Sequence, residues 1–319
     1  MTQQLPDALQ RGAPASPQRS GPLISPIEWT TLGPLPIERL LSAQPKSADT
    51  ATSVALPQAA REALRHWNQF VESGAQAAHD GFFAHAQALW QSAVELEGGG
   101  AGWLLPIGRI EEGKRAPRLS ASMQALAIST LARVYALTDD ANIIRLANAA
   151  ARALQRDIFD GGAGAPIAAL GALPQDVAVY PADHGLAGVM LSLLALHELS
   201  AVDPTEAIAL RDQMTRTFQR ALPAYDLEHG IRDTLTAWGY ASEPSYRVCL
   251  ALLRGLARTT GDPLYETTAA RWKRYGRSWA AARRSLSRVR SGAGKLGWNV
   301  ARGLTRRGAP ARPPHPLEN

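Results

Sequence analysis

The sequence predicts an all-α protein, and two observations lead to that prediction. The chain is rich in alanine and leucine, 45% of its residues are hydrophobic and only 6% are aromatic. Because Ala and Leu lose little entropy in a helix, this composition favours helices, and the runs of Val, Ile and Thr that favour strands are scarce. Turn signals also recur about every 60 residues between segments of helical periodicity.

Each turn signal separates two helical segments, so the repeating unit is predicted to be a helical hairpin. The signals are Ser73-Gly74, Thr138-Asp139-Asp140, Val202-Asp203-Pro204 and Thr260-Gly261-Asp262-Pro263. Asp accepts hydrogen bonds from the free N–H groups at a helix start, and Pro is tolerated in the first turn. The hairpins are predicted near residues 57–96, 119–158, 185–221 and 244–282, and together they indicate an incomplete or complete α/α toroid.

The hairpins divide the chain into three parts. Residues 1–56 are rich in Pro, Ser, Thr and Gln with short apolar islands, which predicts a largely irregular segment that could wrap the body. Residues 57–275 form the toroid, and residues 276–319 form a tail with ten Lys/Arg and one acidic residue. The lone cysteine, Cys249, lies in an apolar run and is interpreted as a small buried hydrophobe.

The basic tail has three interpretations. It places Trp279, Leu286, Val289, Leu296 and Trp298 among arginines, a pattern typical of a helix on an anionic membrane surface, here residues 277–312. A solvated tail fits the same residues equally well. Nucleic acid ranks lowest as a partner, because the body has no aromatic platform or known binding motif.

Compartment and cofactors follow from what the sequence lacks. The N-terminus has no apolar core of a secretory signal and no stretch is long enough to cross a bilayer, so we expect a cytoplasmic protein, with a peripheral place at the inner face of the membrane left open. The scattered histidines and the Gly-rich runs match neither metal-ligand nor phosphate-loop spacing, so we expect no metal and no cofactor. A homodimer is left open.

Three long connections, 97–118, 159–184 and 222–243, join the hairpins and are rich in Gly, Pro, Trp and Tyr. Since short turns link the helices within each hairpin, the long connections are expected at one end of the bundle, where loops on a rigid scaffold often carry function. Tyr180 lies in the second of them and Tyr246 at the helix start after the third. Both phenols are therefore predicted to reach one cleft.

Five stretches resemble, in order and spacing, the C-terminal domain of the D-glucuronyl C5-epimerase family over about residues 57–275. They are GAGWLLPIGR from Gly100, SASMQALAIS from Ser120, Ala178-Val179-Tyr180-Pro181 with the helix after it, LPAYD from Leu222, and Ser245-Tyr246-Arg247 with the Thr260-Gly261-Asp262-Pro263 turn. Two departures stand out: Val179 occupies the place of a family glutamate, and Arg247 that of a histidine.

The resemblance implies an α/α barrel that inverts C5 of D-glucuronic acid residues, giving L-iduronic acid, in a heparan-type polysaccharide. Inversion removes a proton next to a carboxylate and returns one on the opposite face, which requires two acid/base groups, here Tyr180 and Tyr246. Cationic groups must stabilise the extra negative charge, and an arginine beside Tyr246 would favour its phenolate. The substrate contacts are assigned to Trp103, Arg109, Tyr225, Asp226, Arg232, Asp233 and Arg247.

Each assignment has a structural alternative. A tyrosine near proline often packs its ring and hydrogen-bonds locally, and Trp103 either stacks on a sugar or closes the floor of the bundle. The polar cluster of Asp226, Glu228, His229 and Asp233 also suits a solvated turn. For the whole protein, the alternative to the enzyme is a non-catalytic protein with a degenerate epimerase fold that binds anionic glycan or assembles capsule or exopolysaccharide. A lyase that shares the first proton abstraction ranks behind both.

Overall fold

The computed structural model describes residues 27–29, 31–32, 34–42, 48–106, 110–111, 114–115, 118–155, 185–232 and 241–276. The chain divides into two compact units, Met1–Trp272 and Lys273–Asn319. The basic tail predicted from residue 276 onward falls, from 277, outside the described residues.

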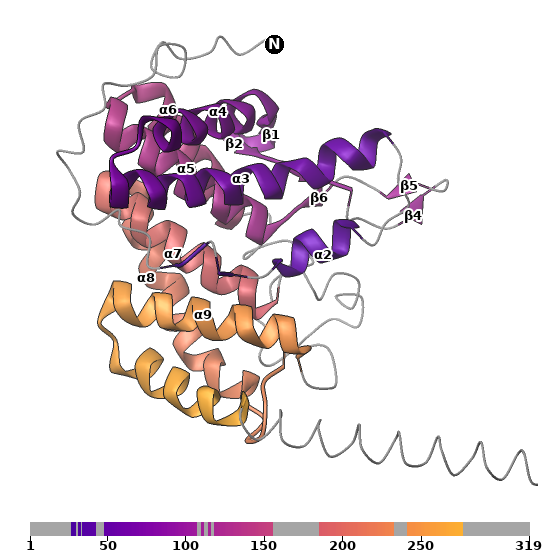
Figure 1. The fold of residues 1–319 in the computed structure, drawn as a ribbon, viewed down its shortest axis with the longest axis vertical. Helices are drawn as coiled ribbons and strands as arrows, with labels where there is room; N and C mark the ends of the chain where they lie inside the picture. The colour runs from indigo at the N-terminus through magenta and orange to yellow at the C-terminus, as the bar shows by residue number, and fades with distance from the viewer. Residues whose placement is uncertain are drawn as a thin grey trace, which may run out of the picture. The chain divides into compact units, whose positions relative to one another are not determined.

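Helices make up most of the described body, which confirms the predicted all-α class (Figure 1). They pair as α3 (Ala48–Ser73) with α4 (Gln76–Ser92), α5 (Ala121–Thr138) with α6 (Ala141–Ala153), α7 (Leu186–Val202) with α8 (Pro204–Ala221), and α9 (Glu243–Thr260) with a last helix over 263–276. Every predicted turn falls between two helices of one pair, so the four hairpins are confirmed over the described residues.

Three of the four turns have an aspartate whose side chain caps the helix that follows. The carboxylates of Asp140, Asp203 and Asp262 each accept the backbone N–H two residues on, at 2.8, 3.1 and 2.8 Å. Gly261 ends α9 with a φ of 67°. This left-handed conformation costs an ordinary L-residue roughly 1–2 kcal/mol, so glycine suits the position.

Neighbouring hairpins pack through their first helices. α3 contacts α5, α5 contacts α7 and α7 contacts α9, as Figure 1 shows, and among the second helices α6 contacts α8. α7 lies within this stack and is buried on nearly all sides, which matches its apolar sequence. Stacked hairpins of this kind are the building units of an α/α repeat, and closure into a toroid stays a prediction.

A buried ion pair links α5 to α7. Nη1 of Arg133 lies 2.6 Å from Oε2 of Glu198, and Nη2 lies 2.7 Å from Oε1. Nη1 also donates to the carbonyl of Ser129 at 2.7 Å. The guanidinium carbon lies 5.9 Å from the ring centroid of Trp67 on α3, within the range of a cation–π contact. One side chain thus contacts the first helices of three hairpins.

Short antiparallel strand pairs, which the sequence did not predict, occupy the connection between α4 and α5. They are β1 (Val94–Leu96) with β2 (Gly100–Gly102), β3 (Leu104–Leu105) with β6 (Arg118–Leu119), and β4 (Ile110–Glu111) with β5 (Lys114–Arg115). A single 3₁₀ turn, η1 (Glu97–Gly99), links β1 to β2. Strands of two or three residues are too short to show the alternation of apolar and polar residues by which a strand is recognised in a sequence.

The irregular segment predicted over residues 1–56 contains helices and has to be corrected. α2 spans Pro36–Ser42, and α3 begins at Ala48 rather than at 57, with Pro57 inside it. A proline inside a helix removes a hydrogen bond and costs about 3 kcal/mol, so the sequence indicated a helix start there. Interior prolines persist where packing offsets that cost, and the side chain of Pro57 is buried.

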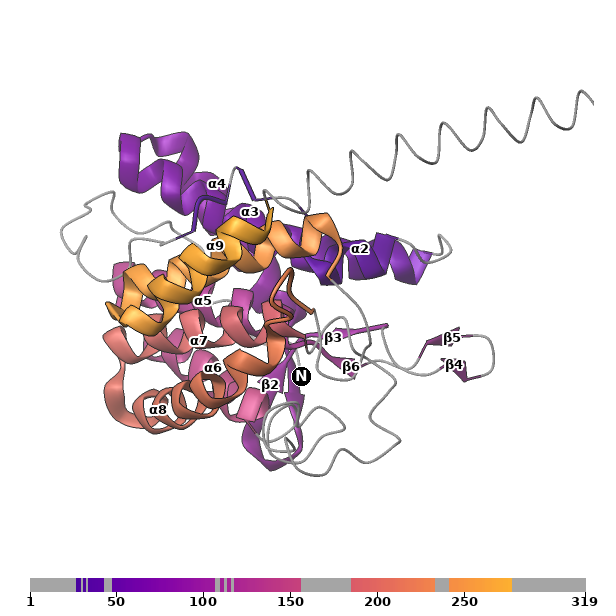
Figure 2. The same ribbon diagram turned by 90° about the horizontal axis from the view of Figure 1, so that it is seen from below.

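The described residues between 27 and 42, called the N-terminal arm below, cover the body. Their apolar side chains are buried, namely Ile27, Trp29, Leu32, Leu35, Ile37 and Leu41. Nδ2 of Asn68 donates to the carbonyl of Ile27 at 2.9 Å, and Nη2 of Arg39 donates to Oγ of Ser245 at 3.0 Å. α2 therefore lies beside the start of α9, as Figure 2 shows. For these residues, the expectation that the segment wraps the body is confirmed.

No helix among the described ones combines the length and the apolarity that crossing a bilayer requires.

Candidate functional site

Tyr246 lies in the first turn of α9. Oγ of Ser242 caps this helix by accepting the N–H of Ser245 at 3.3 Å, and Pro244 occupies the first turn, where its missing N–H costs nothing. The half-buried Tyr246 ring places its hydroxyl against the backbone carbonyl of Trp272, to which it donates a hydrogen bond. The predicted acid/base residue thus joins the start of α9 to the last helix.

Asp226 reaches the same tryptophan from a different segment. It follows the 3₁₀ turn η4 (Leu222–Tyr225), and its Oδ2 accepts the indole N–H of Trp272 at 3.2 Å. The same oxygen lies 2.7 Å from Nε of Arg271. Trp272 therefore contacts both Tyr246 and Asp226, two residues that the sequence assigned to one site.

Arg271 and Trp272 were missed as members of this cluster. The sequence presented them within the helical stretch LYETTAARWKRY, which was noted for its resemblance to the other second helices. An Arg-Trp pair among alanines near a predicted cleft was the available signal. Its partners 26 and 46 residues away, Tyr246 and Asp226, leave no trace in the local pattern.

The segment after Asp226 is a tight turn. Oδ1 of Asp226 accepts the N–H of Glu228 at 3.0 Å, and Asp226 pairs with Ile231 in an isolated antiparallel bridge. Glu228 and His229 are exposed at its tip. These contacts agree with the solvated-turn interpretation for the described members of the polar cluster, of which Asp226 points toward the last helix.

Tyr225 is fully buried, with 0% of its side chain exposed. Its hydroxyl has no hydrogen-bond partner in the part of the chain that the structure describes, and burial raises the pKa of the phenol. Arg232 closes the turn next to it, since its backbone N–H donates to the carbonyl of Tyr225 at 3.0 Å. Tyr225 therefore lies in the core, away from any described surface that could contact a substrate.

Arg247 follows Tyr246 but projects in a different direction. It is 75% exposed, and its Nη2 bonds Oε1 of Glu243 one turn back at 2.6 Å. The sequence-based expectation that this guanidinium stabilises a Tyr246 phenolate is therefore wrong for the described conformation. Successive helical residues point about 100° apart, which separates the two side chains.

Trp103 is also a core residue. Its exposed fraction is 0%, its indole N–H donates to the carbonyl of Leu89 at 2.8 Å, and its backbone N–H donates to Oε1 of Gln124 at 3.1 Å. These contacts favour the packing alternative, in which the ring closes the floor of the bundle, over stacking on a sugar.

Three predicted site residues, Arg109, Tyr180 and Asp233, lie outside the described residues. The shared cleft of Tyr180 and Tyr246 therefore stays a prediction. Among the described residues, no group of three or more His, Cys, Asp or Glu side chains is arranged to hold a metal ion.

Comparison with known proteins identifies a matching family. The family model described as the D-glucuronyl C5-epimerase C-terminus matches residues 107–274, and no curated protein matches the chain significantly. The matched span extends from the connection before α5 to the last helix and contains three of the four hairpins. Since it covers more than half of the chain, the protein belongs to the family of D-glucuronyl C5-epimerase C-terminal domains.

Proposed function

We propose that this protein is a polysaccharide epimerase that inverts C5 of D-glucuronic acid residues, giving L-iduronic acid. A base removes the C5 proton from one face of the sugar ring, and an acid delivers a proton to the other face. Substrate and product differ only in configuration, so the reaction requires no oxidant or reductant. Membership of the epimerase family is the observation that carries this proposal.

Tyr246 is the proposed acid/base group on one face of the ring, and Tyr180 on the other. A phenolate cannot donate a hydrogen bond, so the Tyr246 hydroxyl has to leave the carbonyl of Trp272 before it can accept a proton. Asp226 holds the indole of Trp272 and so acts as a positioning residue for this exchange of partners. Arg109, Arg232 and Arg247 are proposed to stabilise the sugar carboxylate as negative charge builds up on it.

The test is hydrogen exchange at C5. Purified protein is incubated in deuterated water with a glucuronate-containing polymer, and deuterium at C5 is measured by NMR and mass spectrometry. The wild type is expected to incorporate deuterium, and Tyr246→Phe to slow incorporation by at least about a hundredfold, the usual contribution of a general acid or base. Absence of exchange with the wild type would contradict the proposed activity.

Tyr265→Phe is the matched control. Tyr265 is buried and its hydroxyl makes no hydrogen bond in the described structure, so the same chemical change removes no such contact. Exchange should stay at the wild-type rate. A near-ultraviolet absorbing, unsaturated product in the same reaction would indicate a lyase instead.

A specific observation also supports the non-catalytic alternative. The Tyr246 hydroxyl is engaged as a donor to a carbonyl, and Val179 replaces the glutamate found in the resembling motif. A degenerate member of the family that binds anionic glycan would show saturable binding, no exchange, and no change of binding in Tyr246→Phe.

A further inference from the structure

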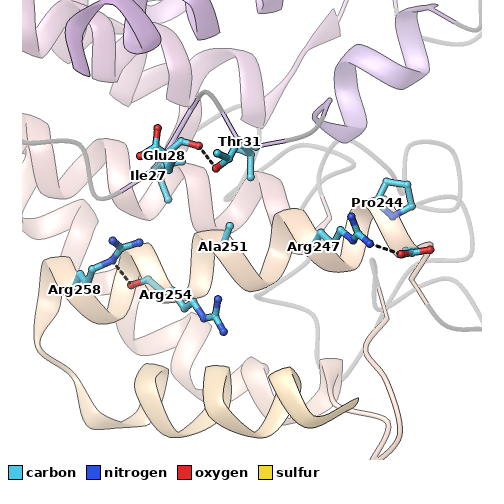
Figure 3. A pocket seen from close by; sticks show the side chains of 10 residues that line it. Ile27, Glu28, Thr31, Pro244, Arg247, Ala251, Arg254 and Arg258 are labelled. Carbon is cyan, nitrogen blue, oxygen red and sulfur yellow. Dashed lines mark hydrogen bonds and ion pairs between the residues drawn. The ribbon is translucent and has the colours of Figure 1, made fainter. Parts of the chain in front are cut away.

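An open groove of about 580 Å³ lies between α9 and the N-terminal arm (Figure 3). This volume is within the range of ~300–1,000 Å³ typical of ligand sites. From α9 it is lined by Arg247, Ala251, Arg254 and Arg258, whose spacing places them on one face of the helix. The arm contributes Ile27, Glu28, Thr31 and Leu32.

The groove lining is net positive, with the three arginines of α9 against Glu28 and Glu243. Arg247 pairs with Glu243, but in the described part of the chain neither Arg254 nor Arg258 forms an ion pair with a carboxylate. Nε of Arg258 instead donates to the backbone carbonyl of Arg254 at 3.4 Å, which leaves both guanidinium charges in place. Like charges four residues apart on a helix repel each other, so an anion that bridges them would be stabilised.

We infer that this groove binds the acidic polysaccharide beyond the reacting sugar, with Arg254 and Arg258 holding carboxylates of the chain. This inference rests on the proposed function. From Arg247 to Arg258 the α9 wall is about 16 Å long at 1.5 Å per residue, longer than one sugar ring. Arg247 follows Tyr246 in the chain but faces the groove, so a polymer that leaves the reacting position has to pass around the start of α9 before it follows the helix toward Arg258.

The chain's own terminal segments are poor occupants of this groove. Residues 1–26 contain one acidic residue and two arginines, and residues 277–319 contain ten Lys/Arg and one acidic residue. Neither segment complements an arginine-lined wall. Charge complementarity therefore favours an anion from outside the chain over either terminal segment.

The lining also distinguishes between acidic polymers. Single-stranded nucleic acid is bound by stacking its bases on aromatic side chains, and the groove lining contains none. Its uncharged lining residues are mainly aliphatic: Ile27, Leu32, Pro244 and Ala251. Such surfaces suit the C–H faces of sugar rings, while the arginines suit carboxylates.

One wall of the groove lies outside the span that matches the family. The matched residues are 107–274, and the arm residues that line the groove lie between 27 and 32. The arm is held there by the contact of Asn68 with Ile27, and by burial of Ile27, Trp29 and Leu32. The full groove is therefore a property of this chain rather than of the matched span.

Binding of a fluorescently labelled, glucuronate-containing octasaccharide, followed by fluorescence anisotropy, tests the inference directly. The double variant Arg254→Ala/Arg258→Ala is expected to raise the Kd at least about tenfold, the effect of losing charge-assisted hydrogen bonds. The double variant Arg216→Ala/Arg220→Ala is the matched control. It removes two exposed arginines of the same spacing from α8 and should leave the Kd unchanged.

Three outcomes would overturn the inference. The first is a wild-type Kd for the Arg254/Arg258 variant, and the second is equal binding of the octasaccharide after its carboxyls are reduced to alcohols. The third is that a single-stranded oligonucleotide displaces the labelled octasaccharide more easily than unlabelled octasaccharide does. The exchange assay separates this failure from failure of the proposed reaction. Exchange at C5 with a Kd insensitive to Arg254 and Arg258 rejects the groove alone. Arginine-dependent binding without exchange rejects the reaction and keeps the groove.

Discussion

At the scale of single residues, the Arg133–Glu198 pair is the strongest test of how the core is held together. Arg133 is 1% and Glu198 6% exposed, and the carboxylate accepts two hydrogen bonds from the guanidinium. In Glu198→Gln the charge of Arg133 stays buried without a counter-ion, which typically costs 3–5 kcal/mol. We expect the free energy of unfolding, measured by urea denaturation, to fall by about this amount.

The exposed pair Arg152–Glu206 provides the matched control. Its side chains are 46% and 53% exposed, so water already screens the two charges. Glu206→Gln should lower the free energy of unfolding by less than about 1 kcal/mol. Equal losses in the two variants would mean that burial does not set the strength of the core pair.

Residue positions in the candidate site were easier to predict than residue contacts. The turn before α9 and the placement of Tyr246 in its first turn follow from local signals, Ser242 and Pro244. The partner of Tyr246, the carbonyl of Trp272, depends on how two helices pack and is invisible in the sequence. The divergence of Arg247 from Tyr246, in contrast, follows from helical geometry and could have been predicted.

Gln124 shows the same limit in the core. It is buried on α5, its Nε2 donates to the carbonyl of Ala101 at 3.0 Å, and its Oε1 accepts the N–H of Trp103. Buried backbone N–H and carbonyl groups need hydrogen-bond partners because unpaired ones are costly, and the side-chain amide of Gln124 supplies these partners. The sequence placed Gln124 in a helix but could not show which strand it would hold.

At the scale of elements, the α3–α4 hairpin carries a pH-sensitive contact. His66 and His85 stack with centroids 5.6 Å apart. Burial lowers the pKa of both rings from the ordinary value of 6.5, with a further lowering by Arg65, while Glu62 opposes it. The two histidines therefore bind protons at higher pH in the unfolded chain than in the folded hairpin. The stability contributed by the packed neutral rings is lost as pH falls below about 6.5.

His85→Phe tests this contact, because it keeps a ring against His66 and removes one titrating group. We expect the urea midpoint of the wild type to fall between pH 7.5 and pH 5.5, and that of His85→Phe to fall less over the same range. Circular dichroism at the two pH values measures both. An identical decrease in the two proteins would place the pH sensitivity elsewhere.

The elements whose signals are local were predicted, and those that depend on packing were not. The three Asp caps and the left-handed Gly74 and Gly261 act within a few residues, so all four hairpin turns were predicted correctly. α2 and the first residues of α3 depend on tertiary contacts such as that of Arg39 with Ser245. The strand pairs of the first long connection are too short to show a pattern, and the closure of the hairpins stays a prediction.

At the scale of the whole molecule, the basic tail is expected to be dispensable for the fold. The first compact unit ends at Trp272, before the tail begins. Deleting residues 277–319 should leave the urea midpoint unchanged and abolish binding to vesicles that contain anionic lipid, because the ten Lys/Arg are removed. Sedimentation with anionic vesicles measures the binding, and neutral vesicles are the control. Equal binding of the truncated protein would show that the tail is not an anchor.

Arg39 of the N-terminal arm donates hydrogen bonds to the hydroxyls of Ser242 and Ser245. This clamp connects the arm to the start of α9. Ser242 caps α9, so loss of the arm would loosen the turn from which Tyr246 projects. A fragment cut at the limits of the family match, 107–274, would keep that tyrosine yet lack the clamp, the α3–α4 hairpin and one side of the groove. Such a fragment is therefore expected to be less active than the chain of 319 residues, in which the arm supports the start of α9.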